Sequence, residues 1–245
     1  MFKWSQCDLI AIPITILIIV VVAVACYFIF KEKSDKLKNI PLHIISGSLI
    51  LLEVIKQIYY ISSGNYPANV IPVHFCSLIV VIIAFAQFAP RKIAKFLDVP
   101  SVIFSIILIL LLLVHPSALL GKSSSGIFLS FPNFHAFVFH ALVMAYPILK
   151  LTLLRFDLKI KQSIMSLICC IVFYASYAIP LAFHLNINYM NILNSYFQPL
   201  ENLRLACGQV VYDIVLFLLG MGGSIMLFFV WYLIDKKTKK EKNYA

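Results

Sequence analysis

Seven long apolar runs, separated by short polar segments, constrain this chain more than any other feature. A run of about 20 mostly apolar residues is long enough to cross a bilayer as a helix. The chain is 62% hydrophobic and only 12% charged, about half the share of charge in a soluble domain. The sequence therefore predicts an all-α polytopic membrane bundle, a single integral membrane domain over residues 1–245, in the cell membrane. The seven predicted spans are about 9–30, 40–61, 71–89, 99–114, 134–154, 162–183 and 210–233.

The basic residues lie in alternate polar segments. Of the 20 Lys and Arg residues, 16 lie on the side of the predicted membrane where the first, third, fifth and seventh runs end, Lys150 within the end of the fifth run and the others beyond the runs. This distribution makes the net charge of +10 a signal of topology rather than of nucleic-acid binding. Because cytoplasmic loops carry an excess of Lys and Arg, we expect the N-terminus outside and the C-terminus in the cytoplasm. The 16 residues are Lys31, Lys33, Lys36, Lys38, Arg91, Lys92, Lys95, Lys150, Arg155, Lys159, Lys161, Lys236, Lys237, Lys239, Lys240 and Lys242.

Polar residues inside the runs gather toward one side of the predicted membrane. Glu53, Lys56 and Gln57 share one face of the second span because they follow i, i+3, i+4 spacing. With the predicted topology, these residues, His135 and Asp213 all lie in outer halves of their spans. The inner halves read as nearly pure Ile, Leu, Val and Phe. Since charged side chains in spans usually face a bundle interior, we expect a polar pocket that opens toward the outer leaflet.

A candidate nucleophile follows a helix-start signal at the third span. Pro72 suits the first turn of a helix, and Cys76 comes four residues later, about 6 Å into the span. His74 is two residues from Cys76 and points nearly the opposite way on a regular helix. The better candidate for a base is His140 on the fifth span, at about 12 Å depth if that helix starts near Pro132.

Three short strings resemble motifs of one membrane family. Pro72-Val-His-Phe-Cys76 resembles the proline, hydrophobic, His or Gln, hydrophobic, Cys motif of the YwaF-like bacterial integral membrane family. The stretch from Phe131 to His140 resembles that family's fifth-helix motif, which ends in a histidine. Asn188-Tyr189 resembles its Asn-Tyr motif after the sixth span. That family is similar to the transmembrane protein 164 family.

The resemblance implies a chemistry and the residues that perform it. The transmembrane protein 164 family is associated with acyl transfer between phospholipids through a Cys and a His, and the motifs match these to Cys76 and His140. The thiol would attack an ester, His140 would take its proton, and a lysolipid hydroxyl or water would accept the acyl group. Tyr189, Asn188 or Lys56 could donate to the oxyanion. The partners would be membrane lipids, a phospholipid or lysophospholipid substrate, with no cofactor, metal or nucleic acid.

Each of these assignments has an alternative. Glu53 and Lys56 could neutralise each other, Cys76 could be packing, and His140 could be a satisfied bundle histidine. A small-solute or ion transporter, or a ligand-sensing module, would use Glu53, Lys56 and Asp213 to bind its ligand. A structural partner subunit is a third interpretation. Cys7 and Cys207 fall in predicted external segments, where they could form a disulfide or remain two thiols.

Overall fold

Seven helices long and apolar enough to cross a membrane confirm the predicted all-α class. The computed structural model describes residues 6–64, 66–114, 116, 126, 128–154 and 156–242, and none of these residues lies in a strand. The predicted basic residue Arg155 lies outside the described residues. The candidate spans are Cys7–Phe30, Asp35–Ser62, Ala68–Phe88, Arg91–Val114, Phe131–Leu153, Ile160–Leu185 and Gln209–Lys239.

Helices α5 (Arg91–Val114) and α4 (Phe75–Phe88) begin at residues that differ from the starts of the predicted fourth and third spans. Helix α5 begins eight residues before the predicted fourth span, because Arg and Lys are good helix formers and the Pro90 carbonyl accepts from the backbone of Ile93 and Ala94. Helix α4 begins three residues after Pro72. There the chain turns tightly instead, with the Val73 N–H donating to the Ile71 carbonyl at 2.7 Å.

The chain divides into two units, of which the first comprises Met1–Tyr66 and Ile79–Asp157. It contains most of α4, all of α5, and four further helices. Helix α7 packs against α1, α3 and α5, and its buried face, which includes Phe139, Val143, Tyr146 and Leu149, forms the centre of this unit. The further helices are α1 (Gln6–Phe30), α2 (Asp35–Lys38), α3 (Ile40–Ser62) and α7 (Phe131–Leu153).

Directions within the first unit follow from single contacts. Tyr59, near the end of α3, packs against Phe131 at the start of α7, with ring centroids 4.8 Å apart, so α3 and α7 are antiparallel. Asp98, near the start of α5, contacts Lys150 near the end of α7, so α5 is also antiparallel to α7. The start of α7 therefore lies beside the end of α3, and the end of α7 lies beside the first turns of α5.

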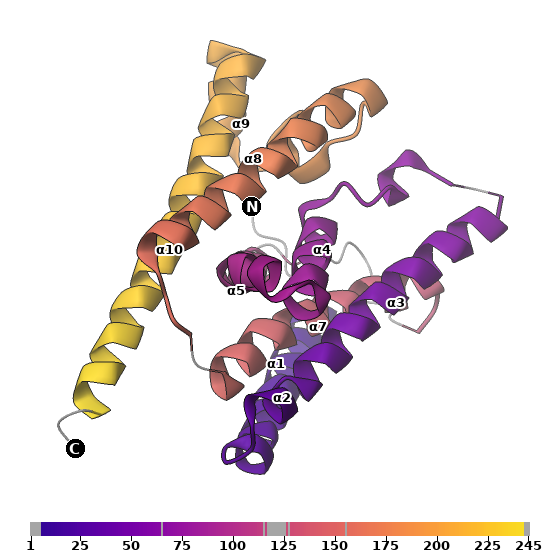
Figure 1. Cartoon of the computed structure of the whole chain (residues 1–245). Helices are drawn as coiled ribbons and strands as arrows, with labels where there is room; N and C mark the ends of the chain where they lie inside the picture. The colour runs from indigo at the N-terminus through magenta and orange to yellow at the C-terminus, as the bar shows by residue number, and fades with distance from the viewer. Residues whose placement is uncertain are drawn as a thin grey trace. The chain divides into compact units, whose positions relative to one another are not determined.

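The second unit comprises Pro67–Leu78 and Leu158–Ala245. Its helix α10 (Gln209–Lys242), yellow in Figure 1, is the longest helix of the described chain, and it packs against α8 (Ile160–Leu185) and α9 (Gln198–Cys207). The unit also contains two short 3-10 helices and the first residues of α4. The 3-10 helices are η1 (Ala68–Val70) and η3 (Tyr189–Asn191).

Candidate functional site

The second-span residues Glu53, Lys56 and Gln57 form one polar cluster on α3, as their spacing predicted. Lys56 Nζ lies 2.7 Å from Glu53 Oε1, and Gln57 Nε2 donates to the same oxygen at 2.8 Å. The Tyr66 hydroxyl donates in turn to Gln57 Oε1. Glu53 Oε2 is buried and has no hydrogen-bond partner among the described residues, so this carboxylate keeps a vacant acceptor.

His135 lies opposite that cluster, on the first full turn of α7. It interacts electrostatically with Lys56 and Glu53, and its ring hydrogen-bonds the backbone of Leu52. The ring also stacks on Phe139, with centroids 5.3 Å apart. Its Nε2 atom is buried and lacks a partner within the described chain. The first unit thus brings His135 together with Glu53 and Lys56, between α3 and α7.

His140 lies on the same helix and has a fixed ring orientation. Its Nδ1 is 2.6 Å from the Ala136 carbonyl oxygen. Because a carbonyl can only accept, Nδ1 carries the hydrogen, and the neutral ring keeps its lone pair on Nε2. His140 lines a small pocket with side chains of α1, α5 and α7, among them Ile12, Leu112 and Met144. A general base that removes a proton through Nε2 requires this tautomer.

Cys76 lies in the first turn of α4, one residue after the helix begins. The 6 Å depth expected from Pro72 is therefore too large, since α4 begins only at Phe75. The His74 carbonyl accepts from the backbone of Ser77 and Leu78, and the His74 ring packs edge-on against Tyr189. Cys76 is partly exposed and forms no disulfide. The first turn of a helix favours negative charge, which suits a thiolate.

A buried tyrosine without a distinguishing sequence signal packs against Phe75, the neighbour of Cys76 in the chain. Tyr174 of α8 interacts electrostatically with Cys76, and its ring packs edge-on against Phe75 at 5.6 Å. The side chain is 9% exposed, and its hydroxyl has no hydrogen-bond partner in the described part of the chain. Tyr174 and Tyr177 look alike in the sequence, so no spacing signal could have identified the one that interacts with Cys76.

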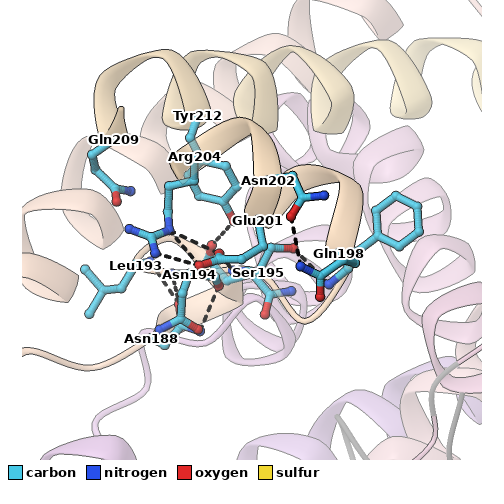
Figure 2. Close-up of polar contacts among 12 residues, drawn as sticks. Asn188, Leu193, Asn194, Ser195, Gln198, Glu201, Asn202, Arg204, Gln209 and Tyr212 are labelled. Atoms are coloured by element: carbon cyan, nitrogen blue, oxygen red, sulfur yellow. Dashed lines mark hydrogen bonds and ion pairs between the residues drawn. The ribbon is translucent and has the colours of Figure 1, made fainter. Parts of the chain in front are cut away.

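Asn188, Tyr189 and Asp213 each make hydrogen bonds within the second unit, and Figure 2 shows Asn188 beside Leu193 and Asn194. Asn188 Oδ1 accepts from the backbone of Leu193 at 2.9 Å, and its Nδ2 donates to Asn194. The Tyr189 hydroxyl donates to the Ala68 carbonyl at 2.8 Å. Asp213 accepts from Gln209 at 2.9 Å. The side-chain donors of Asn188 and Tyr189 are thus engaged in holding the segment between α8 and α10.

An ion pair in α9 also bonds to this segment. Arg204 Nη2 lies 2.6 Å from Glu201 Oε1, and Glu201 Oε2 accepts from the Ser195 backbone at 2.8 Å. The hydrogen bond from Arg204, helped by that from Ser195, lowers the pKa of Glu201 to about 2. The same hydrogen bond raises the pKa of Arg204. Figure 2 shows both side chains turned toward the segment that carries Ser195.

The opposite end of α7 carries a polar network that contradicts one expectation. Lys150, counted above among the loop charges, is 1% exposed and lies inside α7. Its Nζ donates to Asp98 at 2.8 Å, to Ser101 at 3.1 Å and to Tyr146 at 3.0 Å. Gln87 donates to the Tyr146 hydroxyl at 2.7 Å. The expectation that the predicted inner halves are nearly free of polar groups is therefore wrong, because partners from α5 and α7 make a buried Lys150 tolerable.

The predicted site residues fall in both units. The first unit holds Glu53, Lys56, Gln57, His135 and His140, and it brings the first four together. The second unit holds Cys76, Asn188, Tyr189 and Asp213. The pairing of Cys76 with His140 stays a prediction. The six cysteines, all of which the structure describes, form no disulfide, and these include Cys7 and Cys207.

Comparison with known proteins adds one result to this geometry. No curated protein and no solved structure matches the chain. The sequence model of the TMEM164 family matches residues 1–235. That match covers every helix described above except the end of α10, and it includes all the predicted site residues. It confirms the resemblance to the transmembrane protein 164 family, whereas the YwaF-like relationship stays a prediction. This multi-pass membrane chain therefore belongs to the TMEM164 family.

Proposed function

We propose that this protein is a thiol-dependent enzyme that transfers or hydrolyses the acyl groups of membrane phospholipids, with Cys76 as nucleophile and His140 as general base. The observation that carries the proposal is the buried Tyr174 hydroxyl, which has no hydrogen-bond partner among the described residues and interacts electrostatically with Cys76. A buried hydroxyl without a partner costs about 1–3 kcal/mol. That cost is offset when the hydroxyl donates to the oxyanion that forms as a neighbouring thiol attacks an ester.

The proposed reaction has two balanced steps. In the first, the Cys76 thiol gives its proton to His140 Nε2 and its sulfur bonds to the ester carbon. Collapse of the tetrahedral intermediate breaks the carbon–oxygen bond, and His140 returns the proton to the departing lysolipid oxygen. In the second step, a hydroxyl of another lysolipid, or water, gives its proton to His140 and attacks the thioester. The carbon–sulfur bond breaks, and the Cys76 thiol is regenerated.

Tyr174 replaces the oxyanion donors expected from the sequence. The Tyr189 hydroxyl already donates to Ala68, and the Asn188 amide already donates to Asn194. Lys56 is bound to Glu53. The Tyr174 hydroxyl interacts electrostatically with Cys76 and has no acceptor among the described residues. We therefore assign Asn188 and Tyr189 to holding the segment in place and Tyr174 to the oxyanion.

Mass spectrometry of the protein tests this proposal directly. The purified chain is incubated with vesicles of a defined phosphatidylcholine and then digested without reducing agent. We expect an acyl thioester on the peptide that contains Cys76, and none on the peptide that contains Cys169 and Cys170. The Cys170→Ala variant should behave as the unaltered protein, whereas Cys76→Ser should lose most turnover because a neutral hydroxyl needs far more activation than a thiol. A turnover that survives Cys76→Ala would refute the nucleophile.

A second pair of variants tests the roles of His140 and Tyr174. His140→Ala should lose about as much turnover as Cys76→Ser, and the double variant little more, since members of one catalytic unit are not additive. Tyr174→Phe should lower turnover by about 10²–10³-fold, the usual cost of one oxyanion donor. Tyr177→Phe is the matched control and should retain activity. Equal activity of the two Phe variants would remove Tyr174 from the mechanism.

The proposal also requires the Cys76 thiol and the His140 ring to converge. With the other five cysteines replaced by Ala, the His140→Cys variant should be joined to Cys76 by a short bifunctional thiol reagent. A reagent is needed because Nε2 lies several ångströms beyond the His Cβ, whereas a direct disulfide needs Cβ atoms within about 4.5 Å. The Ala141→Cys variant, one residue further along α7, is the control. A failure of His140→Cys to crosslink, with a folded protein, contradicts the catalytic pair.

A second candidate function is transport or sensing of a small solute or ion. One observation favours it: charged groups are buried at both ends of α7, at Glu53–Lys56 and at Asp98–Lys150. Intramembrane charges often mark solute pathways. Ion or proton flux into vesicles that contain the Cys76→Ala variant would support transport, since that variant lacks the proposed nucleophile. Acyl transfer without flux would exclude it.

A further inference from the structure

An apolar groove runs between α1 and α7 in the first unit, away from the predicted site residues. It has a volume of about 430 Å³ and is lined by Val20, Ala23, Val24, Tyr27 and Phe28 of α1 and by Ile148 and Thr152 of α7. Small-molecule sites commonly enclose about 300–1,000 Å³. The α1 residues follow i, i+3, i+4, i+7, i+8 spacing and so form a single stripe. The groove is about 12 Å long from Val20 to Phe28.

The groove offers little that is polar to a ligand, since its polar side chains are only Tyr27, which is exposed, and Thr152. Ala23 is only 4% exposed, and its small side chain leaves the space open. The Thr152 hydroxyl donates to the Ile148 carbonyl of its own helix at 2.7 Å. An occupant must therefore be apolar over this length. An alkyl chain meets that requirement, whereas a polar solute would lose its hydration without replacement.

One end of the groove is basic. Lys31 follows α1 directly, and its ammonium lies 5.8 Å from the centre of the Phe28 ring. Its contact with Glu32 is 3.8 Å long and both side chains are well exposed, so the pair contributes little. The segment from Lys31 to Lys38 contains four Lys, one Glu and one Asp, a net charge of +2. An anionic group at the end of the alkyl chain would be attracted here.

We propose that this groove binds one acyl chain of an anionic glycerophospholipid, whose phosphate contacts Lys31. The apolar floor accounts for the chain, and the excess positive charge accounts for the preference for an anionic headgroup. The lipid is bound here as a ligand that fills the surface between α1 and α7. The proposal does not depend on the proposed enzymatic function, because no residue of the groove belongs to the reaction.

Photocrosslinking of the unaltered full chain provides the first test. The protein is reconstituted with phosphatidylglycerol that carries a diazirine in its acyl chain, and the labelled peptides are identified by mass spectrometry. We expect labelling to concentrate on residues 20–28 and 148–152. Labelling spread evenly over the apolar helices would mean general bilayer contact only and would overturn the proposal.

Variants of the groove and of its basic end provide the second test, with lipid retention in detergent measured by native mass spectrometry. Val24→Phe, at the exposed rim, and Ala23→Phe, at the floor, should both lower retention of phosphatidylglycerol by about tenfold, since the added ring occupies the groove. Val22→Phe, on α1 but outside the groove, is the matched control. Retention by Val24→Phe equal to that by Val22→Phe contradicts the site.

The charge is tested separately. Lys31→Gln should lower retention of phosphatidylglycerol by about fivefold, the effect of one Lys near an anionic surface, and leave retention of phosphatidylcholine unchanged. Lys33→Gln, in the same segment but without the Phe28 contact, should have a smaller effect. Equal losses in the two variants would show attraction by the whole segment and would overturn the assignment of the phosphate to Lys31.

Discussion

Two ion pairs of the first unit, each at least partly shielded from solvent, are built in opposite ways. Glu53 and Lys56 are three residues apart on one helix, and each side chain is about one-sixth exposed, 17% and 16%. Asp98 and Lys150 are 52 residues apart on two helices, and the Lys150 side chain is 1% exposed. The first pair can form in an isolated α3, whereas the second exists only when α5 and α7 are packed together.

The two pairs also differ in how many polar atoms have no hydrogen-bond partner among the described residues. All three ammonium donors of Lys150 are used, by Asp98, Ser101 and Tyr146. Glu53 keeps one buried oxygen without a partner among the described residues, and His135 nearby keeps a ring nitrogen in the same condition. A fully satisfied network fixes structure, while a partly satisfied one can accept a ligand. We therefore expect the Lys150 network to contribute mainly to stability, while a binding role for the Glu53 cluster stays a prediction.

The largest effect should come from removing the counter-charge of Lys150. In Asp98→Leu, a charged Lys150 remains buried without its carboxylate, which costs about 3–5 kcal/mol. Lys150→Met should cost less, because Asp98 is 34% exposed and can regain water. Asp35→Leu, an exposed acidic residue of the same unit, should change little. The free energy of unfolding in mixed micelles is measured for all three variants. Equal stability of Asp98→Leu and Asp35→Leu would contradict the difference expected between the two ion pairs.

The second-largest effect should be a recovery of stability. In the double variant Asp98→Leu with Lys150→Met, no buried charge remains, so most of the loss should disappear. Replacing both members of a buried pair by apolar residues is often neutral or stabilising. A double-variant cycle in mixed micelles gives the interaction energy directly. Simple additivity of the two single losses would show that the pair does not act as one unit.

Changes at the Glu53 pair should have small effects on stability. Lys56→Met should lower the free energy of unfolding by about 1 kcal/mol or less, as for other i, i+3 or i, i+4 pairs. Its effect on phospholipid turnover should be larger than its effect on stability, because the pair lies beside His135 in the predicted pocket. A loss of stability comparable to that of Asp98→Leu would assign both pairs to structure.

The same contrast explains what the sequence could predict. Apolar runs and i, i+3, i+4 spacing are local, so they predicted the seven spans and the cluster at Glu53, Lys56 and Gln57. The Lys150 network joins α4, α5 and α7, and its members are too far apart in the chain for any local pattern to connect them. Lys150 also stood at the edge of an apolar run, where a cation ordinarily faces water.

The candidate site likewise contains residues that the sequence could identify and one, Tyr174, that it could not. Cys76 and His140 were found through motif resemblance, which reports positions without contacts. Tyr174 was missed because its contact with Phe75 and its interaction with Cys76 depend on how the start of α4 packs against α8. The start of α4 itself was misplaced, since Pro72 is compatible with both a first helical turn and the tight turn that the chain adopts.

The smallest effect concerns an ion pair outside the spans, Glu201–Arg204. The pKa of Glu201, lowered to about 2 mainly by its hydrogen bond with Arg204, lies below the usual value of about 4.3 for Glu. Its contribution to the order of α9 is therefore complete above about pH 4.3 and is lost as the pH falls toward about 2. Pepsin cleavage between residues 195 and 207, followed by mass spectrometry, should accelerate over this interval. The Glu201→Gln variant, which cannot titrate, should show no such step beyond the enzyme's own pH dependence. An equal step in both proteins would assign the change to another group and leave the Glu201–Arg204 pair without a role in the order of α9.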